Sequence, residues 1–583
     1  MIDGELLKKI LLEVEKPARY LGGEYNLPDT DKPCKERVCL CFADKYEVGM
    51  SNIGLRILYH MLNDTEGVVC ERCFAPSVDM AEKMRQNAIK LFSLETRREF
   101  TDFDIVGFSI GFELAYTNVL YMMDLAGVPF YAKDRGEEYP LIIAGGPCMV
   151  NPAPIADFFD AIMVGEGEVN LAAFVDLHAK CKSEGMSKAE FLKRASALEG
   201  VYVPSIGGKV KRAVVKDLDK AYFPTKILVP GCDIVHDRST LELFRGCANG
   251  CRFCQACFYY RPIRERKTET LLRQAKELII NTGYEELSLS SLSTSDYSDL
   301  KGLVDGLKEE ADKNNVKLAL PSLRLDSFEA EIYEDTKGAS LTFAPEAGTQ
   351  RLRDVINKNV GDKDILSSLT AALERGVKNV KLYFMIGLPT ETEEDLKGIV
   401  DIVKLVRKLH AEKGRSKIIN IIVSTAVFIP KPLTPFQWEA QISIEEMYEK
   451  QEYLKRELKL KNVKYSWHDA KSSVIEAALA RGDRRQSAVI KRAYETGCVF
   501  DSWNECFDYD KWIAAFDHCG IAPEEYTGAI PLERELAWDF IDNGVTKDYL
   551  LRERERAYNG ITTPNCIGKC NGCGANKLGR CFQ

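Results

Sequence analysis

Short runs of hydrophobic residues alternate with helical patterns between residues 38 and 167. In the helical patterns, such as MSNIGLRILYHMLND, apolar positions recur every three or four residues, and the strand-like runs are VCLCF, VVCERCF, DIVGFSI, PLIIAGG and AIMVGEG. This alternation is typical of βαβ units that build a parallel sheet. Gly49, Gly145 and Gly146 follow such runs, at the carboxyl edge where loops approach a ligand closely. We therefore expect a ligand-binding Rossmann-like domain, and the lack of a Gly-x-Gly-x-x-Gly fingerprint argues against a dinucleotide ligand.

A second region of alternating strand and helix patterns begins near Ser239. Its strand-like runs are LELFR, ELSLSSL, VKLALPSLR, SLTFAPE, VKLYFMIG and IIVSTAVFI, separated by stretches of helical pattern. Six β/α repeats are too many for one short sheet, so they predict a partial (β/α)6 TIM barrel whose chemistry lies at the carboxyl ends of the strands. From about Ser443 the composition turns helical, and the sequence closes with a tail rich in cysteine and glycine.

These patterns predict an α/β protein of six parts. The predicted parts are an N-terminal helical segment at 1–35, a Rossmann-like domain at 36–180, a linker with a hairpin at 181–236, the partial barrel at 237–442, a helical C-terminal domain at 443–560 and a Cys-rich tail at 561–583.

The composition is that of a large globular protein. With 583 residues, 45% of them hydrophobic, the chain is neither a single small module nor a disordered polypeptide. Its net charge of −9 (79 − 88) argues against binding nucleic acid through a general basic surface. We interpret the basic runs KVKRAVVK and RGDRRQ as surface charge, with phosphate contact as the alternative.

The sequence contains no pattern that predicts a membrane span or a secretion signal. The longest apolar-leaning stretch, at 105–123, includes Glu113 and Asn118, so it is expected to divide into a strand and an amphipathic helix. The first residues form a short amphipathic pattern without a small-residue cleavage site. These features predict a cytoplasmic protein.

Nineteen cysteines are many for a chain with these properties, and we expect reduced thiols, some of which bind metal, rather than a disulfide scaffold. Isolated cysteines are expected to be small buried hydrophobes. They include Cys148, Cys181, Cys232, Cys498, Cys506 and Cys519. Two other groups are clustered.

Cys247, Cys251 and Cys254 stand in C-x3-C-x2-C spacing in LELFRGCANGCRFCQAC, directly after the first predicted barrel strand. We call these three residues the cysteine trio. Three thiolates on one tight loop hold three corners of a 4Fe-4S cubane and leave the fourth iron open for a substrate or cofactor. Cys257 is available as a fourth ligand, so zinc or a fully ligated electron-transfer cluster is the alternative.

The trio, with the aromatic Phe253 before its third cysteine, resembles the radical S-adenosylmethionine (SAM) superfamily. The resemblance implies that the trio binds a catalytic cluster whose free iron chelates the methionyl amine and carboxylate of SAM. In that superfamily a polar motif beside the methionyl amine ends the second strand. Here ELSLSSLSTSDY ends that strand, which makes Ser293 and Ser295 candidates despite its departure from the usual Gly-Gly-Glu.

Later strands extend the resemblance. LPSLRLDSF supplies Ser322 and Arg324 as polar candidates on the third strand. LTFAPEAGTQRLRDVINK is similar to the Gly-Thr-x-Arg-x5-Asn-Lys pattern of the branch that includes the methylthiotransferases, and implies that Glu346 and Arg351 face the ribose and the methionyl carboxylate. YFMIGLPTETEEDL, with Gly387, resembles a fifth-strand signature that packs against adenine. For each residue alone, a packed barrel layer or a helix cap is equally open.

The N-terminal half widens the resemblance. DKYEVGMSNIGLRILYHMLN, GFSIGFELAYTNVLYMMDLAG and IIAGGPCMVNPAPIADFFDAIMVGEGE, with FIPKPLTPFQW and ALARGDRRQSAVI, are similar to a bacterial family of radical SAM proteins with a cobalamin-binding domain. This implies a Rossmann-like cobalamin module whose Gly-rich strand ends receive the nucleotide tail. The loop DKYEVGMSNIG contains no histidine, so we expect any bound cobalt to lack a His ligand and to lie near Tyr46 or Met50. A vestigial module used for substrate binding or packing is the alternative.

The second cysteine group lies in TPNCIGKCNGCGANKLGRC. Cys566, Cys570 and Cys573 repeat the C-x3-C-x2-C spacing, and Cys581 follows eight residues later. The segment has few apolar residues to fold it, which indicates ordering by a metal. A second 4Fe-4S cluster and a zinc ion are both compatible, with the short spacings favouring iron and sulfur, and a flexible redox-labile tail is the alternative.

The expected function is that of a radical SAM enzyme, which cleaves SAM reductively to a 5′-deoxyadenosyl radical for cobalamin-assisted methylation or other C–H functionalisation. One alternative is an RNA-modifying enzyme that resembles the methylthiotransferases. Another is a non-catalytic iron–sulfur factor that binds RNA or protein. The enzyme would take electrons from a donor such as flavodoxin or ferredoxin, and the sequence indicates neither the substrate nor the oligomeric state.

Overall fold

The computed structural model describes residues 4–319, 340–412, 418–579 and 581. Its N-terminal part is built on a six-stranded sheet in the order β2-β1-β3-β4-β5-β6, parallel except for the β5–β6 pair. The strands are β1 (Glu36–Phe42), β2 (Val68–Phe74), β3 (Ile105–Ser109), β4 (Leu141–Gly145), β5 (Ala161–Met163) and β6 (Val201–Tyr202). In this order the chain reverses direction across the sheet between β1 and β3, and ligands bind at the carboxyl end of such a switch point.

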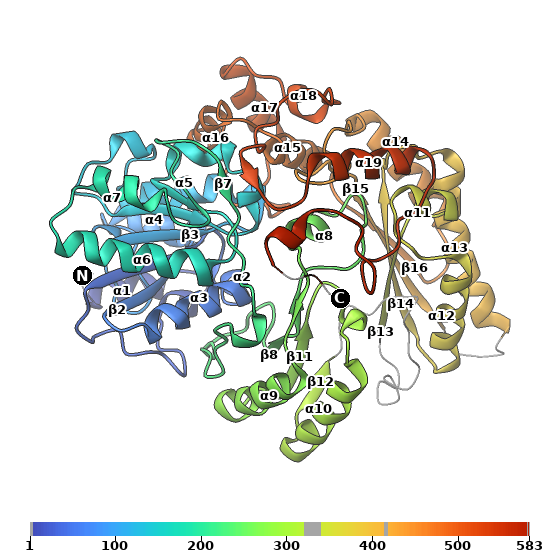
Figure 1. Cartoon of the computed structure of the whole chain (residues 1–583), viewed down its shortest axis with the longest axis horizontal. Coiled ribbons are helices and arrows are strands. Elements are labelled where there is room, and N and C mark those ends of the chain that lie inside the picture. Colours follow the sequence, from blue (N-terminus) through green and yellow to red (C-terminus); the bar gives the residue numbers. More distant parts are fainter. Residues whose placement is uncertain (1–3, 320–339, 413–417, 580, 582–583) are drawn as a thin grey trace.

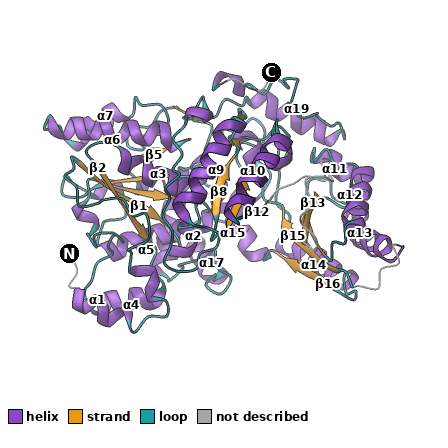
Figure 2. Cartoon of the chain, turned by 90° about the horizontal axis from the view of Figure 1, so that it is seen from below, coloured by secondary structure: helices purple, strands orange, loops and turns teal. Residues whose placement is uncertain are grey.

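Helices cover both faces of this sheet, as Figure 2 shows. One face carries α1 (Gly4–Leu11), α4 (Val78–Gln86) and α5 (Tyr116–Ala126), and the other carries α3 (Ile53–Asp64), α6 (Gly167–Ser183) and α7 (Lys188–Ala195). Successive side chains of a strand point to opposite faces. Cys39 and Cys41 of β1 therefore enter the first core, while Val38 and Leu40 enter the second. Burial on both faces explains the near-continuous apolar runs of these strands.

Two further parallel sheets form the barrel region, in the orders β12-β11-β8 and β13-β14-β15-β16 (Figure 1). Their strands are β8 (Ser239–Glu242), β11 (Glu286–Ser290), β12 (Lys317–Ala319), β13 (Ser340–Glu346), β14 (Asn379–Ile386), β15 (Asn420–Val427) and β16 (Val463–Trp467). The helices between them are α9 (Thr268–Thr282), α10 (Leu300–Asn314), α11 (Gln350–Val355), α12 (Asp362–Glu374), α13 (Glu393–Glu412) and α14 (Ile444–Glu457). The predicted α/β class, a Rossmann-like sheet followed by a β/α barrel region, is confirmed.

The strand β16 lies in the region predicted to be helical. It pairs with β15 from Ile421 opposite Val463 to Thr425 opposite Trp467, and so adds a strand to the six that the sequence predicts. Helices flank this run of five residues closely on both sides, which hides it in the composition. It is the outermost strand of its sheet, a position where short strands are common.

The following helices pack against the N-terminal sheet instead of forming a separate core. They are α15 (Ala470–Ala480), α16 (Gln486–Glu495) and α17 (Tyr509–His518). Ile475, Val489 and Trp512 belong to the same buried core as α1, α4 and α5. The backbone N–H of Phe500 also donates to the side-chain oxygen of Asn118 at 2.7 Å. Residues far apart in the sequence thus complete one face of the sheet.

The last part of the chain returns to the linker and to the barrel. The short strand β17 (Ile541–Asp542) pairs with β7 (Val210–Lys211), and α19 (Lys547–Tyr558) follows. In Figure 1 the red segment after α19 passes beside α8 (Gln255–Tyr259), which directly follows the cysteine trio.

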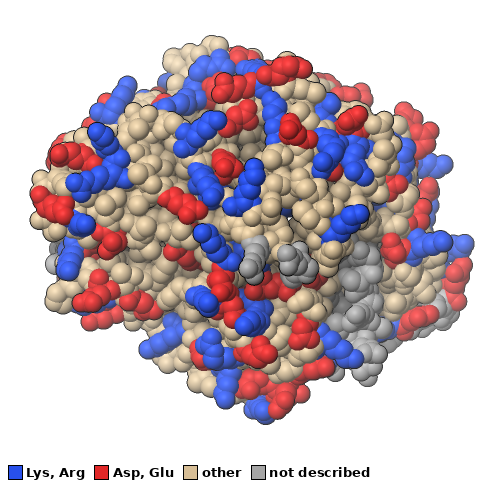
Figure 3. Space-filling view, in the orientation of Figure 1, with Lys and Arg blue, Asp and Glu red and all other residues tan. Residues whose placement is uncertain are grey.

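Two arginines of the basic runs are buried, so the interpretation of those runs as surface charge is wrong for them. Arg212 of KVKRAVVK is 0% exposed and Arg481 of RGDRRQ is 3% exposed. Arg481 can be buried because its guanidinium donates hydrogen bonds to the backbone carbonyls of Gln437, Glu439 and Gly528. On the face shown in Figure 3, basic and acidic side chains are interspersed.

Of the isolated cysteines expected to be buried, half are. Cys148, Cys181 and Cys498 are buried, and Cys232, Cys506 and Cys519 are half-buried. Among the described residues, no helix combines the length and the apolar character needed to cross a lipid bilayer.

Candidate active site

The cysteine trio occupies one short loop after β9 (Phe244–Arg245). Gly246 opens the loop with φ at +96°, and a Cβ there would lie 2.9 Å from the carbonyl oxygen of Tyr260, so the turn requires glycine. Cys247 and Cys251 are buried and Cys254 is half-buried. The loop therefore gathers three thiols in a largely water-excluded place.

A fourth thiol, that of Cys257 on α8, interacts with all three members of the trio. The interaction with Cys257 lowers the pKa of Cys247 to about 6 and also lowers the pKa of Cys254. The thiolate is the form of cysteine that binds metals, so this environment prepares the loop for a metal. In the described part of the chain no three His, Cys, Asp or Glu side chains already stand as a metal-ligand set. The soft sulfur donors suit iron–sulfur clusters or zinc.

The loop after β11 approaches the trio from the next strand. Asn249 donates to the carboxylate of Asp296 at 3.0 Å and lies 3.6 Å from the sulfur of Cys247, so it joins the two loops. Ser293 is buried, and its hydroxyl oxygen has no hydrogen-bond partner among the described residues. Ser295 is half-buried in the same loop. Of the two predicted serines, Ser293 thus has a buried hydroxyl available to a ligand.

The segment after β13 contributes an ion pair beside the trio. Glu346 has φ at +66° at a bulge in β13, and its carboxylate pairs with Lys358 at 3.1 Å. The Lys358 charge also contributes to the lowered pKa of Cys254, after the larger effect of Cys257. Lys358 is a residue that the sequence reasoning missed, although it is the lysine of the Asn-Lys pattern. The asparagine of that pattern, Asn357, donates to the carbonyl of Gly250 in the trio loop at 3.1 Å.

Of the other described candidates, Arg351 and Gly387 are bound to residues of the turn after β14. Arg351 hydrogen bonds the carbonyl of Thr390 and pairs with Asp395, and its side chain is about half exposed. Gly387 has φ at +76° and donates its N–H to Glu391 at 2.9 Å, as expected for a tight turn after β14. Ser322 and Arg324 lie outside the described residues. Phe253 is half-buried and packs beside the trio.

A cavity of about 450 Å³ lies between the carboxyl edge of the N-terminal sheet and the start of the barrel. It adjoins β1 and β3, where the strand order reverses, and Gly145 and Gly146 are among its walls. A Cβ on Gly146 would lie 2.6 Å from the carbonyl oxygen of Ile110, so this edge needs glycine. From the barrel side, Phe244, Tyr259, Tyr260, Ser290 and Ser291 complete the lining. We call this space the interdomain cavity.

Three residues expected near the cofactor do not line the interdomain cavity. A Cβ on Gly49 would lie 2.3 Å from the ring of Phe74, so this glycine serves packing. Tyr46 is buried and donates to Glu24 at 3.0 Å, and the sulfur of Met50 lies 2.9 Å from the Arg72 guanidinium. No histidine is among the described residues that line the cavity, but His236 lines an adjoining hollow of about 290 Å³.

A network of charges fastens the two sides of the cavity together. Arg245 of β9 pairs with Glu168 at 2.6 Å, with Glu242 at 2.8 Å and with Glu166 at 3.5 Å. Arg264 adds a second contact to Glu166, at 2.7 Å. Burial alone would raise the pKa of Glu242, but the charges and hydrogen bonds of Arg245 and Arg266 together outweigh this effect, and the pKa is lowered. The two glutamates of the run AIMVGEGE therefore anchor the barrel, a role that their pattern did not indicate.

The Cys-rich tail lies against the trio loop. The backbone N–H of Cys566 donates to the carbonyl of Ala248 at 3.0 Å, and the carbonyl of Cys573 accepts from Thr546 at 3.0 Å. Cys573 is buried in the same hydrophobic cluster as Cys247 and Cys251, whereas Cys570 is exposed. The tail is thus part of the wall around the trio rather than a separate appendage.

Two family models match the chain. Residues 54–204 match the family described as radical SAM proteins, N-terminal, and residues 241–403 match the radical SAM superfamily. The second range begins in β8 and includes the trio. The chain contains a radical SAM domain. The expectation that the chain is a radical SAM enzyme is confirmed by this match.

Two relatives of the chain differ in how much of it they match. A protein of Methanocaldococcus jannaschii described as uncharacterized is 28% identical over 499 residues, which are 83% of this chain and 98% of that protein. The ribosomal protein uS12 methylthiotransferase RimO of Pelotomaculum thermopropionicum is 25% identical over 311 residues, 49% of this chain and 68% of RimO.

Solved structures of radical SAM proteins also resemble the chain. The cobalamin-dependent SAM radical enzyme OxsB, as an apo structure, has a TM-score of 0.49 at 15% identity and covers 93% of this chain and 82% of its own. The radical SAM methyltransferase TsrM from Kitasatospora setae, with cobalamin and a [4Fe-4S] cluster bound, has a TM-score of 0.46 at 12% identity and covers 67% of this chain and 72% of its own.

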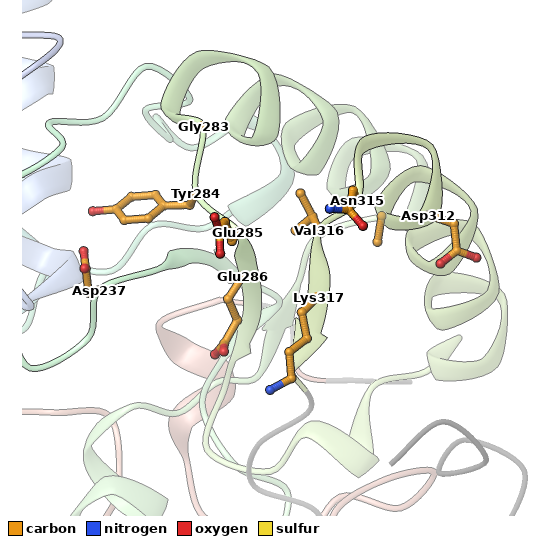
Figure 4. Close-up of a pocket in the computed structure, with 10 residues that line it drawn as sticks. Asp237, Gly283, Tyr284, Glu285, Glu286, Asp312, Asn315, Val316 and Lys317 are labelled. Carbon is orange, nitrogen blue, oxygen red and sulfur yellow. The ribbon is translucent and has the colours of Figure 1, made fainter. Parts of the chain in front are cut away.

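Another hollow of the radical SAM domain, of about 760 Å³, lies at the opposite end of its strands (Figure 4). Glu286 and Lys317 on its wall are the first residues of β11 and β12. In β/α barrels the chemistry lies at the carboxyl ends, and the amino ends serve stability. We therefore assign the active site to the trio and the interdomain cavity, not to this hollow.

Proposed function

We propose that the protein cleaves SAM at a 4Fe-4S cluster held by Cys247, Cys251 and Cys254, and uses cobalamin in the interdomain cavity to methylate or otherwise functionalise a C–H bond of its substrate. When bound, the cluster supplies the electron that splits SAM into methionine and a 5′-deoxyadenosyl radical, and cobalamin supplies a methyl group. The observation that carries the proposal is the closeness of the buried trio to a cavity at the switch point of the N-terminal sheet.

The chain's own residues would bind and orient these groups. The trio thiolates fit an iron–sulfur cluster by their donor chemistry, and the hydroxyl of Ser293 is free to bind SAM. Gly145 and Gly146 let a planar cofactor approach the backbone of the sheet edge, and the aromatic side chains of Tyr259 and Tyr260 close the opposite side. The charge network of Arg245 keeps the two sides together, which limits the entry of water.

The test is anaerobic purification and reconstitution, followed by measurement of iron, sulfide, zinc and cobalt. We expect about four iron atoms per chain for each cluster, cobalt after incubation with hydroxocobalamin, and 5′-deoxyadenosine after addition of SAM and a reductant. In cells, flavodoxin or ferredoxin in the cytoplasm would be the reductant. Intact clusters that produce no 5′-deoxyadenosine would contradict the enzymatic proposal.

Cobalt bound in the interdomain cavity is expected to lack a protein histidine ligand, because none of the described residues that line that cavity is a histidine. If cobalamin binds there, the electron paramagnetic resonance spectrum of the cob(II)alamin form should be the same with unlabelled protein and with protein whose histidines carry nitrogen-15, because the nucleotide base of cobalamin would be the only source of axial nitrogen splitting. His236 provides the matched control, since it lies in the adjoining hollow. His236→Ala should leave the spectrum unchanged, and an effect of this substitution on the axial signal would refute the expectation.

We also propose that Cys566, Cys570, Cys573 and Cys581 hold a second metal centre beside the first. The hydrogen bond between Cys566 and Ala248 places the tail against the trio loop, within the reach of electron transfer. For a second 4Fe-4S cluster, Cys573→Ser should lower iron from about eight to about four atoms per chain. Isolated Cys519→Ser is the control and should change nothing. Loss of zinc instead of iron would assign the tail a structural zinc ion.

An RNA-modifying activity is the second candidate, and the similarity to methylthiotransferases over about half of the chain favours it. The two activities differ in the product. After reaction with methyl-labelled SAM, a methylthio group on RNA or ribosomal protein would indicate the second candidate, and a methyl group on carbon would indicate the first. A non-catalytic factor would bind RNA or protein and produce no 5′-deoxyadenosine.

A further inference from the structure

Arg212 is a buried cation without a carboxylate partner in the described part of the chain. It is 0% exposed, and its Nε and Nη1 atoms have no hydrogen-bond partner there. Its Nη2 donates to the backbone carbonyl of Arg261. Burial of a charge is unfavourable unless the charge is paired. The residue therefore needs an explanation beyond packing.

The other fully buried arginines show how this protein ordinarily satisfies such a charge. Each of them forms an ion pair: Arg72 with Glu24 and Glu95, Arg252 with Glu553, Arg266 with Glu242, and Arg353 with Asp362. Glu166 is the one carboxylate whose charge acts on Arg212, but no ion pair joins the two residues among the described side chains. Its Oε2 is bound by Arg245 and Arg264, and its Oε1 has no hydrogen-bond partner in the described part of the chain. Among the described buried arginines, Arg212 shares the feature of two unpartnered donors only with Arg261, and of these two it is Arg212 that lines the interdomain cavity.

The surroundings hold this guanidinium at the wall of the interdomain cavity. Arg212 lines the cavity, and its guanidinium lies 5.0 Å from the ring centre of Tyr259. Its backbone N–H donates to the backbone carbonyl of Asp542 in β17 at 2.9 Å, which fixes the chain beside that strand. Gly165 leaves room for the side chain, because a Cβ there would lie 2.9 Å from the Cγ of Arg212. The donors are therefore fixed in place before any ligand binds.

We propose that Arg212 binds a phosphate oxygen of the ligand in the interdomain cavity. The planar guanidinium matches phosphate geometry, and the glycine-bearing edge of a parallel sheet is a common place for phosphate groups. This inference rests on the proposed function in one respect, since cobalamin carries a phosphodiester in its nucleotide tail. The phosphate of a free nucleotide has the same chemistry, and the experiment separates the two sources.

The experiment compares the wild-type protein with Arg212→Met in titrations with hydroxocobalamin, with cobinamide, which lacks the nucleotide tail, and with ADP. We expect Arg212→Met to weaken hydroxocobalamin binding about 10- to 100-fold and to leave cobinamide binding unchanged. The ligand-free variant should also unfold at a higher temperature than the wild type, because an unpaired buried charge has been removed. Arg135→Met, which breaks the buried pair with Asp160, is the control and should lower that temperature without changing binding.

Each other outcome decides the question. Unchanged hydroxocobalamin affinity in Arg212→Met, or equal loss of cobinamide binding together with a lowered unfolding temperature, would overturn the proposal. If the wild type binds neither hydroxocobalamin nor cobinamide, the proposal that the protein uses cobalamin fails, and the ADP titration then tests Arg212. ADP binding that is lost in Arg212→Met would support a phosphate site at Arg212. If the wild type does not bind ADP either, the proposal for Arg212 is overturned. Should Arg212→Met not fold, Arg212→Lys replaces it, with weaker binding expected because the fork geometry is lost.

Discussion

Cys251→Ala is expected to abolish the formation of 5′-deoxyadenosine and to remove about four iron atoms per chain. The reason is that Cys251 is the middle member of the trio and shares one buried loop with Cys247 and Cys254. Two thiolates cannot hold the cubane while leaving one iron free for SAM. The measurements are iron and sulfide content after anaerobic reconstitution, and 5′-deoxyadenosine by chromatography after reduction with SAM.

Cys257→Ser is the matched control for this prediction. Cys257 contacts all three trio thiols but lies outside their sequence spacing, so its loss should leave the iron content and the amount of 5′-deoxyadenosine close to wild type. A loss of iron in Cys257→Ser as large as in Cys251→Ala would indicate a fully ligated cluster. Zinc in place of iron in the wild-type loop would refute the SAM-binding role of the trio altogether.

Arg245→Met is expected to lower the free energy of unfolding by about 3–5 kcal/mol, because it leaves Glu168 unpaired and removes one of the two cations that pair with Glu166 and with Glu242. Glu166, Glu168 and Glu242 all pair with Arg245, whose side chain is 13% exposed. The measurement is chemical or thermal unfolding of the ligand-free protein at neutral pH. Arg273→Met, which removes an exposed pair with Glu277 on α9, should change stability by less than about 1 kcal/mol.

The same network makes a prediction about pH. The pKa of Glu242 is lowered in the folded protein, so its contribution to stability is present above the ordinary glutamate pKa of about 4.3 and is lost as pH falls through the lower folded value. The wild type should therefore keep this contribution from pH 7 down to about pH 4.3 and lose it below. In Arg245→Met the loss of stability should shrink on acidification, because protonation neutralises the carboxylates that have lost Arg245 as a partner. A deficit independent of pH would contradict this account.

Hydrophobic periodicity was sufficient to predict the parallel sheet of the N-terminal part and most barrel strands. Runs such as VCLCF are buried on both faces of the sheet. A strand that is buried on both faces needs apolar residues at successive positions, so a continuous apolar run predicts it. Periodicity was insufficient for β16, since five residues between two helices carry too little alternation. It also could not predict that α15, α16 and α17 cover the N-terminal sheet, because an apolar helix face does not specify its partner.

The sequence likewise predicts some parts of the candidate site and not others. Spacing in the sequence located the trio, because its members are local and share one loop. The ion pair of Glu346 and Lys358 depends on a bulge in β13, and the burial of Arg212 depends on the pairing of β7 with β17, which joins residues about 330 positions apart. Such long-range contacts leave no local pattern. The placement of Tyr46 and Met50 away from the cavity was missed for the same reason.

The shared core has a practical consequence for dissecting the protein. An excised fragment limited to the N-terminal sheet would present to solvent the apolar face that Ile475, Val489 and Trp512 cover in the intact chain. Exposed patches of that kind promote self-association and loss of solubility. Studies of the first domain in isolation would therefore have to graft α15, α16 and α17 back onto it, or reintroduce them as a separately produced polypeptide.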